Sequence, residues 1–171
     1  MEKKKKNWRR DYLDDFTADE NGRYSYTGRS FSLDAGKMKT RRQLRLLGFL
    51  AFGSVFAAGC LPGTDSGGRF YILLPYLAAF ACGGGCVWQA LALGFSGEIR
   101  AYVFKRAGAA LLFLPAAGFR AALLTAAAEA FAALYFRKGI FIFQLLYAGL
   151  MLLSAVFFGL SRRESKKFCV F

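Results

Sequence analysis

Two ionisable residues stand inside a long apolar run of the sequence. The stretch "LPAAGFRAALLTAAAEAF", from Leu114 to Phe131, contains Arg120 and Glu129. Insertion scales place the cost of an arginine at the centre of a bilayer at about 2.5–3.5 kcal/mol, and ionisable residues at such depth usually serve function. An arginine could bind an anion or a carboxylate, and a glutamate could exchange a proton or a cation. Both residues are therefore candidates for transport or for assembly.

The spacing of these two residues prevents them from pairing on one helix. Arg120 and Glu129 are nine positions apart, which is about two and a half helical turns and about 13.5 Å along the axis. They therefore point to opposite faces, and each needs another polar neighbour, for which Gln89 and Gln144 are candidates beside Thr125. The alternative is that both side chains snorkel, Arg120 toward the inner headgroups and Glu129 toward the outer ones.

Two cysteines four residues apart raise the question of redox or metal chemistry. Cys82 and Cys86 in "CGGGC" could bind a soft metal such as Cu(I) or act as a redox couple. However, a disulfide between these positions of a regular helix is strained. Rows of small residues at this spacing favour helix–helix contacts in lipid. We therefore predict helix packing for Cys82, Gly83 and Cys86, and also for Gly53 and Ala57.

Composition indicates a membrane protein rather than a soluble domain. The chain has 171 residues, of which 56% are hydrophobic and 19 are phenylalanine, above the usual 45–50% of soluble domains. The apolar residues are bunched and the charges lie between the bunches. The sequence has no histidine and no nucleophile with an adjacent base, so we predict no catalytic residue, no cofactor and no metal site.

Four apolar runs have the length of a transmembrane helix, about 20 residues. Short links join them, so neighbouring helices must be antiparallel, and an up-down four-helix bundle follows. The fold class is therefore an all-α polytopic membrane protein. The predicted spans are about 44–61, 70–93, 107–136 and 140–160, which form a membrane domain at 44–160 between the tails 1–43 and 161–171.

The distribution of lysine and arginine predicts the orientation. The first tail up to Arg45, the middle link and the last tail together carry 20 of these residues, whereas the opposite links carry three. By the positive-inside rule, both termini of this multi-pass protein are cytoplasmic. We expect it to reside in the inner membrane of a bacterial-type cell.

The beginning of the first tail is strongly basic. Such a patch, with one tryptophan, is typical of binding to anionic lipid headgroups, and no recognition fold accompanies it that would indicate nucleic acid. A solvated flank that only sets topology is the alternative. The membrane-surface candidates are Lys3, Lys4, Lys5, Lys6, Trp8, Arg9 and Arg10.

A second part of the tail, "RYSYTGRSFSL" at 23–33, alternates apolar and polar residues about a central turn. This pattern predicts a short β-hairpin. Because an isolated hairpin is marginal in water, its aromatic face must bury against a partner or against the protein's own cytoplasmic face. The partner-binding candidates are Tyr24, Tyr26, Phe31 and Leu33.

These observations favour a small membrane protein that is an accessory or regulatory subunit of a larger transport or secretion complex. Its helices, rich in alanine and glycine, are typical of helices that pack closely with neighbours. The partners expected are the lipid bilayer and either another membrane protein or a second copy of the chain. A homo-oligomeric transporter or channel that uses Arg120 and Glu129 is the first alternative. A thiol redox or metal-handling protein that uses Cys82 and Cys86 is the second.

Overall fold

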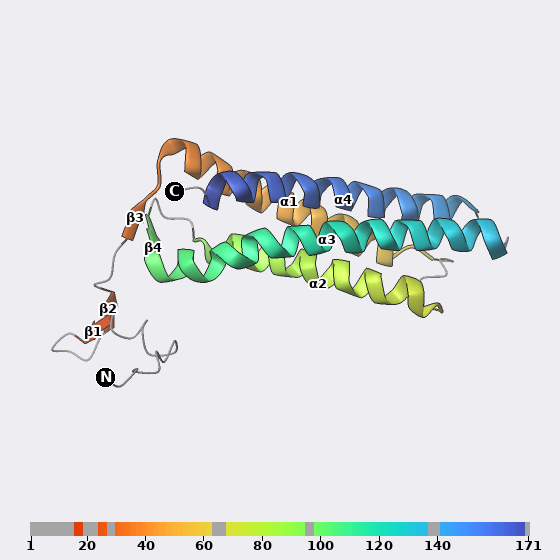
Figure 1. The fold of residues 1–171 in the computed structure, drawn as a ribbon, viewed down its shortest axis with the longest axis horizontal. Coiled ribbons are helices and arrows are strands. Elements are labelled where there is room, and N and C mark those ends of the chain that lie inside the picture. The colour runs from red at the N-terminus through yellow and green to blue at the C-terminus, as the bar shows by residue number, and fades with distance from the viewer. Residues whose placement is uncertain are drawn as a thin grey trace, which may run out of the picture.

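Four long helices make up the fold in the computed structural model, which describes residues 16–18, 24–26, 30–62, 68–94, 98–136 and 141–169. Within the bundle, α1 packs against α2 and α4, and α3 packs against the same two helices. Successive helices run in opposite directions along one elongated bundle (Figure 1). The helices are α1 (Ala35–Gly59), α2 (Phe70–Ala92), α3 (Ala101–Phe136) and α4 (Phe141–Cys169).

The outer surface of the bundle is apolar, as it should be in a membrane protein. Large side chains such as Leu134, Trp88 and Phe113 are 76%, 72% and 69% exposed, whereas soluble proteins rarely expose large contiguous apolar patches. Three helical segments are long and apolar enough to cross a bilayer, namely Phe70–Ala92, Ala107–Tyr135 and Ile142–Cys169. Together these features support a helical membrane protein, in which three of the described helices could span the bilayer.

Helix α1 differs from the other three because its first half is basic. Lys37, Lys39, Arg41, Arg42 and Arg45 all lie within this helix. α1 is accordingly not among the three segments that qualify by length and composition. The predicted first span, 44–61, stays a prediction.

One end of the bundle is called the basic end here: α1 and α3 begin there, and α2 and α4 end there (Figure 1). The opposite end is called the loop end. Towards the basic end, α1, α3 and α4 extend beyond the predicted spans, to Ala35, Ala101 and Cys169. The predicted tail 161–171 is therefore helical as far as Cys169, because Ser161, Ser165 and Phe168 form an inward face.

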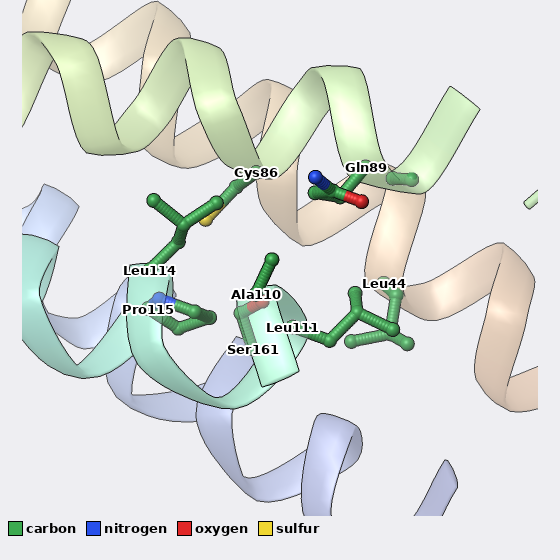
Figure 2. A pocket seen from close by; sticks show the side chains of 9 residues that line it. Leu44, Cys86, Gln89, Ala110, Leu111, Leu114, Pro115 and Ser161 are labelled. Carbon is green, nitrogen blue, oxygen red and sulfur yellow. The ribbon is translucent and has the colours of Figure 1, made fainter. Parts of the chain in front are cut away.

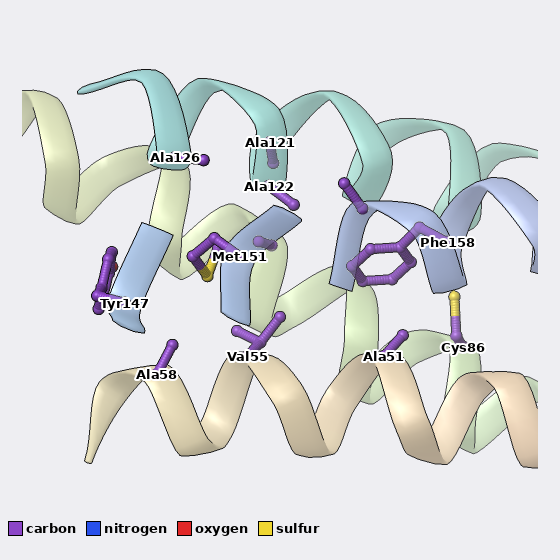
Figure 3. Close-up of a cluster of buried hydrophobic side chains, with 12 residues drawn as sticks. Ala51, Val55, Ala58, Cys86, Ala121, Ala122, Ala126, Tyr147, Met151 and Phe158 are labelled. Carbon is purple, nitrogen blue, oxygen red and sulfur yellow. The ribbon is translucent and has the colours of Figure 1, made fainter. Parts of the chain in front are cut away.

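A hydrophobic core fills the middle of the bundle (Figure 3). Alanines of α1 and α3 leave room there for larger side chains of α4, among them Tyr147, Met151 and Phe158, all fully buried. α3 and α4 approach each other closely at Gly118, where a Cβ would lie 2.6 Å from a ring carbon of Phe158. Small residues thus let these two helices pack closely, as lipid-embedded helices commonly do.

Helices α1 and α2 also meet at small residues. A Cβ on Gly83 would lie 3.3 Å from the Cα of Phe52, and one on Gly48 would lie 3.6 Å from the backbone of Cys86. Gly53 and Ala57, for which helix packing was predicted, are exposed on the surface of this bundle, so their packing stays a prediction. A different face of α1 points into the bundle, and it carries three fully buried residues: Ala51, Val55 and Ala58.

A second cluster of apolar residues closes the basic end. Leu33 precedes α1 and is 7% exposed, packed with Leu44 of α1, Ile99 of the α2–α3 link and Phe168 of α4. For the segment 23–33, burial either against a partner or against the protein itself was predicted. Leu33 is buried against the protein itself.

Four three-residue strands form two antiparallel pairs. β1 (Phe16–Ala18) pairs with β2 (Tyr24–Tyr26), and β3 (Ser30–Ser32) pairs with β4 (Glu98–Arg100). The predicted hairpin at 23–33 would have paired Tyr24–Tyr26 with the segment that contains Phe31. In the structure each of these two segments pairs elsewhere, since Phe31 lies opposite Ile99 in the α2–α3 link. The alternation of apolar and polar residues within 23–33 cannot reveal such a pairing, because the partner strand lies far away in the sequence.

Candidate functional site

Arg120 lies on the outside of the bundle. It occupies the middle of the apolar segment Ala107–Tyr135, and its side chain is exposed. No hydrogen bond or ion pair joins it to another residue in the described part of the chain. The guanidinium is therefore directed away from the bundle, towards the lipid or protein that surrounds α3 in the membrane.

Arg120 belongs to a continuous stripe along the outer surface of α3. Residues spaced three and four apart share one helical face. Of the six residues in this stripe, five are exposed and Ala116 is half-buried. The Arg120 stripe consists of Phe113, Ala116, Arg120, Leu124, Ala127 and Phe131.

Glu129 lies on the opposite side of the same helix and is completely buried, with 0% exposure. The predicted opposition of Arg120 and Glu129 therefore holds in the structure. One turn earlier, Thr125 is also fully buried, and its hydroxyl donates a hydrogen bond to the carbonyl of Ala121 at 2.8 Å. A carboxyl group thus sits inside the helix bundle, among side chains rather than lipid.

Polar residues of other helices lie at the same level as Glu129. The contact of Gly118 with Phe158 fixes the antiparallel register of α3 and α4, and this register places Glu129 level with Tyr147. Gln144 and Tyr147 are 4% and 0% exposed. The ring of Tyr147 lies 6.3 Å from that of Tyr76, whose hydroxyl donates to the carbonyl of Val55 at 3.4 Å.

The half of the bundle towards the loop end thus contains several buried polar side chains, here called the Glu129 cluster. It consists of Thr125, Glu129, Gln144 and Tyr147, with Tyr76 at its edge. Carboxyl, amide and phenol groups can pass or hold a proton, or donate oxygen ligands to a cation. Of the predicted candidates, Gln144 lies in this cluster and Arg120 does not.

Gln89, the fourth candidate, lines a small cavity closer to the basic end (Figure 2). The cavity holds about 10 Å³, close to the least that one water molecule needs. Pro115 forms part of the wall, and because proline has no backbone N–H, the carbonyl of Leu111 lacks its usual helical donor. The wall consists of Leu44, Cys86, Gln89, Ala90, Ala110, Leu111, Leu114, Pro115 and Ser161.

Two arginines of α1 have a role that the sequence did not indicate. Arg41 donates to the carbonyl of Leu93 at 3.4 Å, and Arg45 donates to the carbonyls of Ala90, at 3.2 Å, and Gly94. These carbonyls end α2, which carries no basic residue in its own last turn. Burial lowers the pKa of Arg41 from its ordinary value, and the nearby charge of Arg45 adds to this effect.

The sequence signal for this contact would have been the absence of a basic residue in the last turn of α2. A helix end leaves up to four carbonyls without helical donors, and cations are favourable there because of the helix dipole. In the sequence analysis, Arg41 and Arg45 were counted only as basic residues that set the orientation, and no contact was predicted for them.

The cysteines occupy different environments. Cys86 is buried, Cys82 is half-buried, and both are free thiols. Among the residues with described positions, no group of three histidine, cysteine or acidic side chains is arranged to hold a metal ion.

The remaining candidates lie in the tail. Lys3, Lys4, Lys5, Lys6, Trp8, Arg9 and Arg10 fall outside the described residues. Tyr24 and Tyr26 belong to β2 and Phe31 to β3.

Comparison of the chain with protein families, with curated proteins and with solved structures finds no match.

Proposed function

We propose that this protein is an accessory subunit of a larger membrane complex, and that it docks through the outer surface of α3. The observation that carries this proposal is the position of Arg120: it is exposed, and it lies in the middle of the apolar segment Ala107–Tyr135. A cationic side chain at that depth in a bilayer needs a polar or oppositely charged partner. The described part of the chain supplies none.

Snorkelling is a poor alternative for Arg120 because of its depth. The hydrocarbon core of a bilayer is about 30 Å thick, so a residue at its middle lies about 15 Å from either surface, a distance longer than the arginine side chain. Water defects and local thinning of the bilayer reduce the cost of such a charge, but a partner subunit removes that cost without distorting the membrane.

Four crossings with both ends in the cytoplasm complete the proposal. α1 would cross at 44–61, and its outer surface carries large exposed side chains suited to lipid, namely Leu46, Phe49 and Phe56. The basic end would face the cytoplasm of an inner membrane, because the lysines and arginines gather there.

Purification tests the proposal most directly. The chain is extracted from its native membranes in a mild detergent, and total mass and co-purifying proteins are measured together. A second membrane protein in fixed stoichiometry supports an accessory subunit, provided that Arg120→Leu loses it and Arg120→Lys retains it. A monomer or a homo-oligomer in every preparation contradicts it.

A second candidate function is transport of a proton or a cation by a homo-oligomer, and burial of Glu129 favours it. The side chain of Glu129 is completely buried inside the bundle, and Gln144 and Tyr147 of α4 are buried as well. Purified protein in liposomes should then dissipate a proton or cation gradient. Glu129→Gln should abolish this flux while the fold is preserved; equal flux in both proteins would exclude Glu129 as the carrier.

A further inference from the structure

We propose that the Arg120 stripe binds one transmembrane helix of a different protein, and that this helix carries an aspartate or glutamate opposite Arg120. The inference rests on the proposed function and names the chemistry of the partner. It follows from which charges the chain has within its helices, where they point, and how the stripe is shaped.

A second copy of this chain cannot supply the carboxylate. The four helices contain only two acidic residues, Glu129 and Glu164. Glu129 is 0% exposed on the inward side of α3, and Glu164 lies near the basic end, where it accepts a hydrogen bond from Lys167 at 2.6 Å. Neither can reach the Arg120 of a neighbouring copy at mid-span.

Self-association through this stripe would also be repulsive. A symmetric contact between two parallel copies brings the same surface of both chains together, so the two Arg120 guanidinium groups would face each other in lipid. Like charges opposed in an interface disfavour the wrong partner strongly. The stripe therefore discriminates against its own copy and selects a partner of opposite charge.

The shape of the stripe suits a helix. Ala116 and Ala127 lie about one to two turns on either side of Arg120, and small residues let two helices approach closely in lipid. Phe113, Leu124 and Phe131 alternate with them and are 69%, 63% and 57% exposed. An apolar helix can pack against this surface of small and large side chains. Its small residues would then lie over the phenylalanines, and its aspartate or glutamate would lie over Arg120.

The chemistry of arginine explains why a carboxylate is the expected group. The guanidinium presents a planar fork of donors that fits a carboxylate through two parallel hydrogen bonds. In a medium of low dielectric, such a pair is strongly attractive, and removal of either member leaves an uncompensated charge. The pair would thus hold the complex together and fix its register.

A photo-crosslinking experiment in native membranes tests the inference. A photoreactive amino acid replaces Leu124 of the stripe in one variant and Leu74 of α2 in another. The two leucines are matched, since each is 63% exposed. The expected result is that only the Leu124 probe reacts with a different protein, within an apolar segment that contains an aspartate or glutamate.

Second substitutions at Arg120 then test the charge itself. In the Leu124 probe variant, Arg120→Leu should lower the crosslink yield at least about tenfold, because loss of a buried ion pair weakens binding by that much or more. Arg120→Lys should retain most of the yield. Reversal of both charges, Arg120→Asp here with lysine at the partner's acid, should restore it.

Several outcomes would overturn the inference. They are a crosslink to a second copy, a crosslink to lipid alone, a partner segment without an acid, and an equal yield after Arg120→Leu. If a partner co-purifies but only the Leu74 probe reaches it, the accessory function stands and the Arg120 contact is wrong. If no partner co-purifies at all, both proposals fail.

Discussion

Phe158 of α4 packs its ring directly onto Gly118 of α3. A Cβ on Gly118 would lie 2.6 Å from one ring carbon of Phe158 and 2.8 Å from two others. Phe158 is fully buried and belongs to the hydrophobic core of the bundle (Figure 3). This contact sets the register of α3 and α4, and with it the level of Glu129 in α3 relative to Tyr147 in α4.

Gly118→Ala should therefore destabilise the protein. The ring of Phe158 is fully buried, and overpacking of a well-filled core costs about 1–3 kcal/mol. Gly108→Ala is the matched control in the same helix, because nothing lies within 4 Å of a Cβ there. Thermal unfolding in detergent should show a lower midpoint for the first variant and an equal or higher midpoint for the second. Equal midpoints would show that α3 and α4 do not meet at this glycine.

Arg45→Ala should loosen the junction of α1 with α2. Its guanidinium bonds to the carbonyls of Ala90 and Gly94 at the end of α2, and hydrogen bonds to charged groups contribute about 1.5–3 kcal/mol each. Hydrogen exchange of the backbone amides near residue 90 should become faster. Arg42→Ala, which removes an exposed arginine one turn away, should leave that exchange unchanged; faster exchange in both variants would point to the loss of charge alone.

The predicted spans agree with α2 and with the loop-end bounds of the other helices, but α1, α3 and α4 extend further at the basic end. Apolar runs mark the spans because lipid requires apolar side chains over about 20 residues. Beyond those runs α4 continues with polar residues, and its inward face there contains Ser165 and Phe168. Hydropathy cannot detect such a segment, because packing at the basic end rather than lipid stabilises it.

Contacts between distant segments were the other part that the sequence could not give. The nine-residue spacing was enough to place Arg120 and Glu129 on opposite faces of one helix. Which of the two faces outward depends on where α2 and α4 lie against α3. The pairing of Phe31 with Ile99 and the bonds from Arg45 to α2 likewise join positions far apart in the chain.

Native cysteines allow a direct test of the proposed orientation. Cys60 caps the end of α1 at the loop end and is exposed, whereas Cys169 ends α4 at the basic end. If the basic end is cytoplasmic, a thiol reagent that cannot cross membranes should label Cys60 in intact cells. Cys169 should become labelled only after lysis, and Cys60→Ser should remove the first signal.

The reverse order of labelling would place the basic end outside the cell and contradict the positive-inside assignment. Cys86 gives an internal control for folding. Because it is buried between helices, it should remain unlabelled until the protein is denatured.

Substitutions at Glu129 and Arg120 should separate folding from assembly. Glu129→Ala removes most of a fully buried side chain, and such truncations in a core cost about 2–5 kcal/mol. Glu129→Gln nearly preserves volume and keeps polar atoms in the cluster, so its midpoint of thermal unfolding should fall less. Arg120→Ala changes an exposed residue and should shift the stability of the purified chain by no more than about 0.5 kcal/mol. The same Arg120→Ala protein should nevertheless fail to retain its partner during purification. A large loss of stability on Arg120→Ala would instead mean that the guanidinium serves the fold of this chain.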